Sequence, residues 1–447
     1  MKTLFLFIPH YVFTSDLLHT NFIKSLSEKY RVVVFGPVSS SNYYQSSNVE
    51  YISREAEYPK FWLLFTKTLR LSFVREFDNL EYLKLRRKQK INMNWQRYLL
   101  RGISWLLPRS LTTASFFTKL ETWLLPNSES FQKYVKKYRP SIVLTCTPGF
   151  NNLEAEAIIL AKKNGIPTAS INSSWDNYTS NSVQFRRTDY LICWNEVMKK
   201  EAIKIHRYPE SRVFVSGTYR FDHHFQPHGK EPTREEFLFS KGLDPALKTL
   251  WLCTVPPNTY PPQYGVWKEI VRMRESGELA QNVNLFFRIH PNDEAEYYKE
   301  YQGLKNIHVE LAGHTKEKAP GSGQKIEMDE KDLDNLRHSF QYTDININFR
   351  SSLNLESSIY DQPCIDLALE NYRERYWVDW YIPLVESGGL KLVSTEEELR
   401  KAINDYLKNP KLDSSGRKKI FDDYIGFRDG LSYQRSVDAI SKIVTLI

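Results

Sequence analysis

Two short segments in the C-terminal half combine an apolar run with side chains that bind phosphate or ribose. Residues 286–291 read Phe-Phe-Arg-Ile-His-Pro, and residues 346–356 read Asn-Ile-Asn-Phe-Arg-Ser-Ser-Leu-Asn-Leu-Glu. Guanidinium, imidazole and serine hydroxyl groups donate hydrogen bonds to anions, and a carboxylate accepts them from ribose hydroxyls. We therefore expect a site for a nucleotide and its phosphates. Its candidate residues are Arg288, His290, Pro291, Arg350, Ser351, Ser352, Asn354 and Glu356.

The first segment predicts a strand that ends at Pro291. Arg288 and His290 are two residues apart, so both side chains point to one side of that strand. A fixed cation and a tunable donor suit a leaving phosphate. The alternative interpretation is an ordinary surface pair at the mouth of a loop.

The second segment predicts a strand followed directly by a helix. Ser351 or Ser352 would cap that helix or offer its hydroxyl to phosphate. Glu356 lies one turn into the helix, where its carboxylate would accept the two ribose hydroxyls. The alternative is a helix start stabilised by a serine cap and an early glutamate.

The rest of the chain alternates between strands and helices, which predicts an α/β protein with parallel sheets. In such sheets, ligands bind beyond the carboxyl ends of the strands, where both segments end. The predicted strands are 4–8, 32–35, 142–146, 168–171, 190–194, 213–216, 249–255, 285–289, 307–311, 345–349 and 364–368. The predicted helices are 16–30, 129–138, 153–164, 196–205, 264–275, 333–340, 355–360, 395–407 and 433–447.

A chain of 447 residues exceeds what one hydrophobic core usually organises, so we expect two domains. The first is an N-terminal Rossmann-like domain at 1–225, with a helical insert at about 55–128. A linker at 226–247 leads to a second Rossmann-like domain at 248–415, and residues 416–447 form helices that pack back on the first domain. A cleft between the domains would be the default active site.

The four cysteines lie far apart, each within or beside an apolar run. We interpret them as core residues in a reducing compartment and not as disulfides or metal ligands. Residues 1–8 imitate a signal peptide, but the run is short and no small-residue cleavage site follows, so a first strand is expected. No window reaches the roughly 20 apolar residues of a membrane span. Residues 313–328 predict a mobile loop.

The formal charge of +8 is concentrated in residues 60–139, which hold 17 Lys and Arg against 5 Asp and Glu. Aromatic residues such as Trp62 and Trp123 are interleaved with the basic ones. This mixture suits peripheral contact with a membrane surface that carries anionic lipid, or an acidic acceptor. The alternative is a set of amphipathic helices with a solvated basic face. Nucleic acid is not expected as a partner.

In this context the chain resembles glycosyltransferases of the GT-B fold, in which two Rossmann-like domains with parallel sheets face a central cleft. More narrowly, it resembles bacterial capsule and cell-wall transferases: Kdo transferases, GT-B sialyltransferases and CDP-glycerol glycerophosphotransferases. Those groups pair a His-Pro element with a later Ser-Ser element around a CMP or CDP moiety, here His290-Pro291 and Ser351-Ser352. The acidic residue that binds donor ribose in the superfamily matches Glu356. Loops at 173–180, 194–196 and 217–218 resemble those that border the cleft.

An inverting transferase needs a base to deprotonate the acceptor hydroxyl. The acidic pair followed by Gly that carries the base in the sialyltransferases has no match here. Asp176, in a polar loop after a buried strand, is the first choice, and Asp16 and His10, after the first strand, come next. Each has a structural alternative: Asp176 would cap a turn, Asp16 would cap the next helix, and His10 would be a loop residue. A retaining reaction needs no such base.

No metal and no other cofactor is expected. The His-rich run 222–228 lacks the partners typical of zinc sites. No Asp-X-Asp sequence occurs at a strand end, and no Walker-type loop occurs. Departure of the nucleotide would instead be assisted by Arg288, His290, Arg350 and a helix N-terminus.

The resemblance thus implies a metal-independent glycosyltransferase at the cytoplasmic face of the membrane. It would move a sugar from a CMP- or UDP-linked donor to a surface polysaccharide or a lipid-linked glycan. The C-terminal domain would hold the nucleotide sugar and the N-terminal domain the acceptor. The alternatives are a transferase of glycerol or ribitol phosphate from a CDP-linked donor, a UDP-sugar epimerase, and an inactive transferase-like subunit of an assembly complex.

Overall fold

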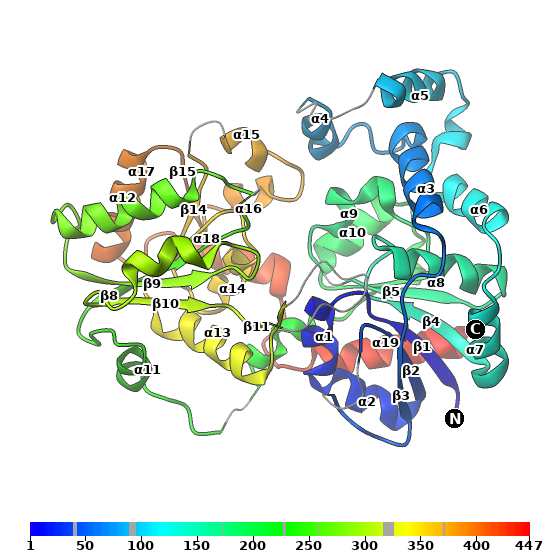
Figure 1. Cartoon of the computed structure of the whole chain (residues 1–447), viewed down its shortest axis with the longest axis horizontal. Coiled ribbons are helices and arrows are strands. Elements are labelled where there is room, and N and C mark those ends of the chain that lie inside the picture. Colours follow the sequence, from blue (N-terminus) through cyan, green and yellow to red (C-terminus); the bar gives the residue numbers. More distant parts are fainter. Residues whose placement is uncertain are drawn as a thin grey trace. The chain divides into compact units, whose positions relative to one another are not determined.

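The computed structural model describes residues 1–38, 43–88, 95–172, 174–226, 229–257, 259–315, 326–369 and 372–447. The chain forms two α/β units, each built around one parallel sheet (Figure 1). Met1–Asp222 and Asp429–Ile447 belong to the N-terminal unit, and the described residues from His223 to Arg428 form the C-terminal unit. The predicted α/β class with two parallel sheets is confirmed.

The sheet of the N-terminal unit has the strand order β3-β2-β1-β4-β5-β6-β7. Its strands are β1 (Thr3–Phe7), β2 (Arg31–Gly36), β3 (Val49–Ser53), β4 (Pro140–Thr145), β5 (Thr168–Ile171), β6 (Tyr190–Cys193) and β7 (Val213–Val215). The helices around it are α1 (Tyr11–Leu18), α2 (Asn21–Lys29), α7 (Glu129–Tyr138), α8 (Asn152–Lys163), α9 (Asn177–Ser180), α10 (Glu196–Lys204) and α19 (Ser432–Leu446). Leu4 and Leu6 of β1 pack with α1, α2 and α19, whereas Phe5 and Phe7 pack with α7 and α8. The sheet is therefore buried on both faces, as a parallel sheet requires.

Two differences from the predicted elements occur near the N-terminus. The helix expected at 16–30 is divided into α1 and α2, because Thr20 has an extended backbone and its hydroxyl accepts the N–H of Phe22 at 3.4 Å. Strand β3 is absent from the predicted set. It lies at the sheet edge and most of its side chains are only half-buried, so its sequence lacks the apolar run that marks the central strands.

The stretch expected to be a helical insert forms α3 (Lys60–Phe73), α4 (Glu81–Lys88), α5 (Trp95–Trp105) and α6 (Ala114–Leu124). A small apolar core joins α3, α4 and α6, with Phe77 and Phe117 among its members. Arg70 of α3 is buried and forms an ion pair with Glu121 of α6 at 3.1 Å. A second buried cation, Arg186, contacts the same carboxylate at 3.0 Å. These charges fix α3 against α6.

The sheet of the C-terminal unit has the strand order β10-β9-β8-β13-β14-β15. Its strands are β8 (Lys248–Cys253), β9 (Val283–Ile289), β10 (Ile307–Leu311), β13 (Ile345–Asn348), β14 (Cys364–Leu367) and β15 (Lys391–Val393). Its helices are α11 (Arg234–Ser240), α12 (Gln263–Glu275), α13 (Glu330–Tyr342), α14 (Leu353–Ile359), α15 (Arg373–Tyr376), α16 (Ile382–Glu386), α17 (Glu396–Lys408) and α18 (Ser414–Ile420). Leu250 and Leu252 of β8 pack with α12 and α17, and Trp251 and Cys253 pack with α11 and α13.

Parts of the C-terminal unit also differ from the predicted elements. Helix α11 falls within the stretch 226–247, which we expected to be a linker, and it packs against α13. Strand β15, three residues long and at the sheet edge, is not among the predicted strands. A short antiparallel ladder joins β11 (His314–Thr315) to β12 (Ile326–Glu327). Residues 316–325 of the predicted mobile loop lie outside the described residues.

Helix α19 returns to the N-terminal unit. Asp222 accepts the backbone N–H groups of Ser432 and Tyr433, at the start of this helix, at 3.0 and 2.9 Å. At its other end, Lys2 Nζ donates to the carbonyl of Val444 at 2.9 Å. No helix among the described residues combines the length and the apolar character needed to cross a membrane.

Candidate functional site

Three loops of the C-terminal unit follow neighbouring strands at the carboxyl edge of its sheet. His290 follows β9, Thr254 follows β8 and Arg350 lies in the loop after β13, and these strands are adjacent in the order β9-β8-β13. The backbone N–H of His290 donates to Thr254 Oγ1 at 2.9 Å, so the first two loops are joined directly. Adjacent strands are about 4.8 Å apart, so the outer loops are separated by about 10 Å. One diphosphate with its ribose can span that distance.

His290 presents one ring nitrogen as a hydrogen-bond donor. The backbone N–H of Asn292 donates to His290 Nδ1 at 3.0 Å. Nδ1 therefore carries no proton, and the proton of the neutral ring lies on Nε2. Burial lowers the pKa of His290, although the charge of Asp293 acts in the opposite direction. The imidazole is neutral near pH 7 and can donate its Nε2–H to a phosphate oxygen.

The carboxylate of Asp293 fixes the loop that carries His290. Its Oδ1 accepts the hydroxyl of Tyr264 at 2.7 Å, and its Oδ2 accepts the hydroxyl of Tyr298 at 2.8 Å. The backbone N–H of Asp293 donates to the carbonyl of His290 at 2.8 Å. Two tyrosines on different elements hold the Asp293 carboxylate, and the Asp293 backbone holds His290. His290 is therefore confined to one orientation. Asp293 is not among the residues predicted from the sequence, although its place two residues after the His-Pro element was a signal.

Arg288 has an acidic partner within the C-terminal unit. It is buried near the end of β9, and its Nη1 lies 2.8 Å from Glu310 Oε1 on β10. Burial would raise the pKa of Glu310, but a hydrogen bond from His308 and the charges of Arg288 and Lys241 lower it to about 2. Glu310 is therefore ionised and balances Arg288. Contact between Arg288 and a phosphate stays a prediction.

The loop after β13 is held by a buried carboxyl group of β14. Arg350 has a left-handed backbone with φ of 45°, which costs a non-glycine residue about 1 kcal/mol. Its N–H donates to Asp366 Oδ1 at 2.6 Å, and the N–H of Ser351 donates to Asn348 Oδ1 at 3.2 Å. These two hydrogen bonds offset the cost of the conformation. They place the two serines at the carboxyl end of β13.

The serine hydroxyls differ in their partners. Ser351 Oγ accepts the N–H of Leu353 at 3.2 Å. Ser352 occupies the cap position of α14, yet its side chain makes no capping hydrogen bond. The capping role that we considered is therefore not performed by the Ser352 hydroxyl. The guanidinium of Arg350, in the same loop, lies 5.0 Å from the centre of the Trp380 ring.

Asn354 belongs to a buried hydrogen-bond network. Its Nδ2 donates to Asp366 Oδ2 at 3.1 Å and to the hydroxyl of Tyr381 at 2.6 Å, and its Oδ1 accepts from Asn348 at 2.6 Å. Burial raises the pKa of Asp366 to about 7, although the backbone hydrogen bond and the charge of Arg350 both act to lower it. Asn354 thus helps to hold the loop after β13 in place through its hydrogen bond to Asp366. Its predicted contact with nucleotide stays a prediction.

Glu356 is buried one turn into α14, beside an imidazole. His224 Nε2 lies 3.2 Å from Glu356 Oε2, and His224 Nδ1 lies 3.0 Å from the hydroxyl of Tyr360. If Nε2 donates to the carboxylate, Nδ1 accepts from the tyrosine, which fixes both side chains. In the sequence, His224 stands out only as part of a His-rich run. The ribose contact of Glu356 stays a prediction.

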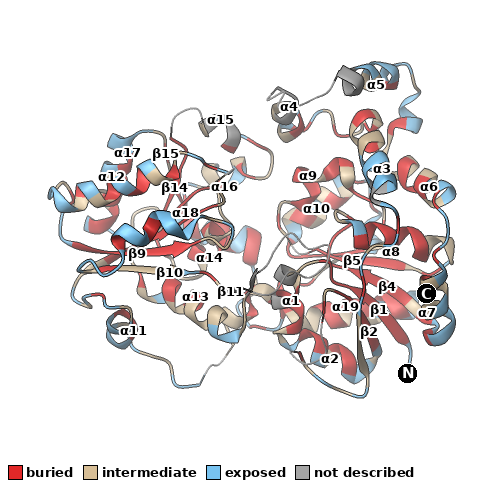
Figure 2. Ribbon diagram, viewed as in Figure 1, coloured by how far each residue is buried: buried red, intermediate tan, exposed pale blue. Residues whose placement is uncertain are grey.

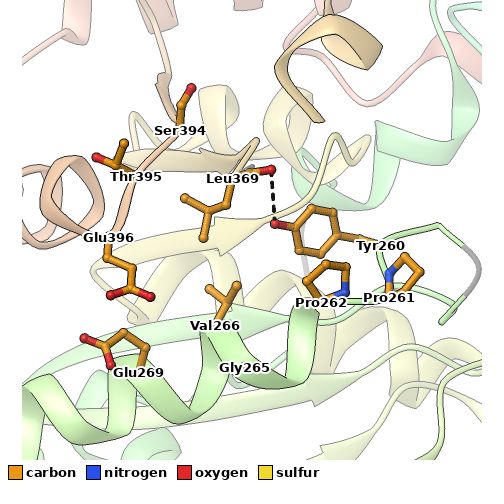
Figure 3. Close-up of a pocket in the computed structure, with 10 residues that line it drawn as sticks. All are labelled: Tyr260, Pro261, Pro262, Gly265, Val266, Glu269, Leu369, Ser394, Thr395 and Glu396. Carbon is orange, nitrogen blue, oxygen red and sulfur yellow. Dashed lines mark hydrogen bonds between the residues drawn. The ribbon is translucent and has the colours of Figure 1, made fainter. Parts of the chain in front are cut away.

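A pocket of about 500 Å³ adjoins these loops within the C-terminal unit (Figure 3). Leu369 after β14, Ser394 after β15 and Tyr260 after β8 contribute to it. The ring of Tyr260 also stacks on Phe349, directly before Arg350, with centres 4.4 Å apart. Of the two glutamates in the lining, Glu269 is paired with Arg272 at 2.5 Å, so Glu396 supplies the negative charge, and the pocket suits hydroxyl groups better than phosphate. The lining residues are Tyr260, Pro261, Pro262, Gly265, Val266, Glu269, Leu369, Ser394, Thr395 and Glu396.

The first candidate base, Asp176, lies at the start of α9 in the N-terminal unit. Its Oδ1 accepts the hydroxyl of Ser174 at 2.5 Å, and its carbonyl accepts the N–H of Ser180 at 2.9 Å. The side chain is half-buried. Its backbone therefore stabilises the turn, as the alternative interpretation supposed, while the carboxylate still reaches the surface. Ser173 in the same loop lies outside the described residues.

The other two candidate bases follow β1. Asp16 is buried, and both of its oxygens accept from the guanidinium of Arg220 at 2.9 Å. A carboxylate held in this way is a weak base. Burial lowers the pKa of His10, so its ring is neutral near pH 7. The buried His10 Nδ1 has no hydrogen-bond partner among the described residues. By these criteria His10 is better suited than Asp16 to accept a proton.

A buried acid in the first turn of α8 was missed by the sequence analysis. Burial raises the pKa of Glu154 to about 8, although hydrogen bonds from Thr147 and Asn151 oppose this. The N–H of Thr147, directly after β4, donates to Glu154 Oε1 at 2.8 Å. Glu154 has no solvent exposure, so it positions the loop after β4. In the sequence it is indistinguishable from an ordinary first-turn glutamate.

Among the described residues, no group of three His, Cys, Asp or Glu side chains is placed to hold a metal ion. In the His-rich run, Asp222 instead accepts the N–H groups at the start of α19. Pro227 and His228 lie outside the described residues.

Comparison with known proteins gives no sequence relative: no family model and no curated protein matches the chain. Solved structures do match it over its whole length. Staphylococcus aureus MnaA with UDP is 13% identical, with a TM-score of 0.56 and coverage of 100% of this chain and 98% of MnaA. The UDP-GlcNAc 2-epimerase of Neisseria meningitidis bound to UDP-GlcNAc is 13% identical, with a TM-score of 0.55 and coverage of 99% and 100%. The wall teichoic acid polymerase TagF is 12% identical, with a TM-score of 0.51 and coverage of 100% and 89%.

Similarity at such identities defines a fold and not an activity. It extends across both units and agrees with the two parallel sheets, whose strand orders place each set of loops at one edge. The chain has the GT-B fold.

Proposed function

We propose that this chain is an enzyme that acts on a nucleotide sugar, and that its C-terminal unit binds the nucleotide at the carboxyl ends of β8, β9 and β13. The observation that carries the proposal is the fixed Nε2–H donor of His290 at the same sheet edge as the hydroxyls of Ser351 and Ser352. A neutral donor and two hydroxyls bind a phosphate oxygen without the desolvation cost of a second buried charge. Two of the similar structures hold UDP or UDP-GlcNAc, which supports a uridine nucleotide.

Of the reactions considered, epimerisation of a UDP-sugar has the better support from the similar structures. This reaction removes a proton from a sugar carbon and returns it on the other face, so it needs acid and base groups but no acceptor. Neutral His10 and the carboxylate of Asp176 are the groups proposed for these proton transfers. The acidic pocket beside Tyr260 would face sugar hydroxyls.

Glycosyl transfer, the reaction expected from the sequence, is the second candidate. The His-Pro and Ser-Ser elements favour it, and so does the similarity to a polymerase of wall teichoic acid. In that case Asp176 or His10 would deprotonate an acceptor hydroxyl. Transfer of a polyol phosphate would use the same nucleotide site.

Ligand binding tests the common part of the proposal. The melting temperature would be measured with UDP, UDP-GlcNAc, CMP and CDP; a nucleotide at 100 times its Kd stabilises the folded state by about 2.7 kcal/mol. No stabilisation by any of the four would refute the nucleotide site.

His290→Ala should weaken binding of that nucleotide about 10- to 100-fold, because a hydrogen bond to a charged group contributes about 1.5–3 kcal/mol. The matched control is Asn292→Ala, since only the backbone N–H of Asn292 contacts the imidazole and its side chain is exposed. Equal loss in both variants would contradict the role of His290.

Product analysis separates the two reactions. Incubation of UDP-GlcNAc in D₂O, followed by NMR, should show deuterium at the sugar carbon beside the anomeric centre if the enzyme is an epimerase. Release of UDP that depends on an added glycan or polyol-phosphate acceptor, without deuterium uptake, would instead establish a transferase. Binding without either reaction identifies a protein that only holds the nucleotide.

A further inference from the structure

The helical segment of the N-terminal unit exposes apolar side chains to an unusual degree. More than half of the exposed large apolar side chains among the described residues lie between residues 61 and 124. Phe61 of α3 is 71% exposed and Trp123 of α6 is 77% exposed, and the ribbons of both helices carry exposed stretches, pale blue in Figure 2. An exposed apolar surface of this kind marks an interaction site.

Packing holds this apolar surface in one arrangement. The rings of Phe61 and Phe65 are stacked with centres 6.2 Å apart, and the ring of Trp62 stands edge-on to Phe65 at 5.9 Å. Between α3 and α6, Trp62, Phe65 and Leu124 line a hollow of only about 10 Å³, so the two helices pack closely here. Since the buried ion pairs of Glu121 lock these helices together, the aromatic side chains project from a rigid base.

A basic pocket of about 610 Å³ lies beside Trp123. Its lining includes Lys119 of α6, Lys163 of α8 and Arg212 before β7. Lys119 and Trp123 are four residues apart and so share one helix face. The acidic group in this lining, Asp189, is already paired with Lys162 at 3.2 Å. Within the described residues, Lys119, Lys163 and Arg212 form no ion pair, so the pocket carries excess positive charge.

We propose that the surface formed by α3, α6 and this basic pocket binds the face of a lipid bilayer that contains anionic lipid. The apolar side chains of Phe61 and Trp123 enter the boundary between headgroups and acyl chains. The ammonium groups of Lys119 and Lys163 contact the negative lipid phosphates. Neither set suffices alone, because aromatic side chains supply little selectivity for charge and lysines supply no apolar burial.

The combination favours lipid over other partners. A protein interface of this kind is depleted of lysine at its core, whereas here lysines flank the aromatic side chains directly. A nucleic-acid surface would have aromatic side chains stacked between bases, yet Phe61, Trp62 and Phe65 contact one another. The inference does not depend on the nucleotide site of the other unit.

Vesicle flotation tests the proposal with the full-length protein. Vesicles of phosphatidylcholine alone would be compared with vesicles of phosphatidylcholine and phosphatidylglycerol, and the protein should float only with the second. The double variant Lys119→Glu/Lys163→Glu should lower the bound fraction about tenfold or more, since each basic group near such a surface contributes about a fivefold factor. The double variant Phe61→Ser/Trp123→Ser should lower it by a similar factor, because it removes the apolar side chains that enter the bilayer. The matched controls in the C-terminal unit are Phe239→Ser, which replaces a side chain 78% exposed, and Lys305→Glu.

Circular dichroism would show that the variants, all at the surface, are folded. The proposal is overturned if wild-type protein fails to float with the anionic vesicles, or if the controls lose as much binding as the test variants. It is also overturned if a single-stranded oligonucleotide displaces the protein from the vesicles and its binding is lost in the same two double variants. That result would assign the surface to nucleic acid.

Discussion

Replacing Asp366 with Asn should remove a pH dependence of stability that this buried carboxyl group imposes on the C-terminal unit. Burial raises its folded-state pKa from 3.8 to about 7. The folded protein therefore binds this proton more tightly than the unfolded chain does. The resulting stabilisation is complete below the unfolded-state pKa and is lost as the pH rises through 7. Between pH 6 and pH 9 the wild-type protein should lose about 1.4 kcal/mol from this group.

The geometry of the network also sets the cost of the substitution. In the variant, the amide oxygen can still accept the N–H of Arg350. The amide nitrogen would take the place of Oδ2, the oxygen that accepts from Asn354 Nδ2 at 3.1 Å, so two N–H donors would face each other. Asn354 cannot turn over, because its Oδ1 accepts from Asn348 at 2.6 Å. Two facing donors cost about 1–3 kcal/mol. Asp366→Asn should be less stable than wild type by this amount at pH 6, and the difference should shrink by about 1.4 kcal/mol at pH 9.

Urea unfolding across this pH range measures both quantities, followed by tryptophan fluorescence, to which the buried Trp251 and Trp267 of the C-terminal unit contribute. The pKa of Glu154 in the other unit is also raised, to about 8, but its effect is common to both proteins and cancels in the difference. A difference between wild type and variant that stays constant from pH 6 to pH 9 would refute the reasoning.

Three further substitutions probe the packing. Glu121→Ala removes the carboxylate between two buried guanidinium groups and should cost about 3–5 kcal/mol in urea unfolding; a loss under 1 kcal/mol would show that the pair is not buried in solution. Gly416→Ala places a Cβ 2.3 Å from the backbone of Gly388 and should lower the melting temperature strongly, whereas Gly102→Ala in α5 meets no atom within 4 Å and should stabilise by about 0.5–1 kcal/mol. Similar melting temperatures for the two glycine variants would contradict the close backbone approach.

The parts of the fold that the sequence predicts best are the central strands. β1 and β9 are buried along their whole length, and each contains an apolar run, residues 4–7 in β1 and 285–287 in β9, that marks it in the sequence. The edge strands β3 and β15 carry half-buried side chains and are short, which leaves no distinct pattern. The division of α1 from α2 depended on one extended residue, Thr20, which propensity alone does not reveal.

For the candidate site, the sequence predicts which loops carry polar groups but not which partners those groups have. His290 was identifiable from its position at a strand end, whereas its single orientation depends on Asp293 and two tyrosines. Arg288 looked available for phosphate because its acidic partner, Glu310, lies on the next strand of the sheet. Such pairings arise from strand order and register, which a single sequence does not specify.

The return of α19 to the N-terminal unit has a consequence for biosynthesis. Its residues Val437, Ile440 and Ile443 complete the core beneath β1 and β4, although some 200 residues of the C-terminal unit are translated first. As the chain leaves the ribosome, part of one face of the seven-stranded sheet therefore stays uncovered, because α1 and α2 cover only the rest of it, while the C-terminal unit can fold first. We expect this order, opposite to the order of translation, to make the nascent N-terminal sheet a substrate for chaperones until α19 emerges.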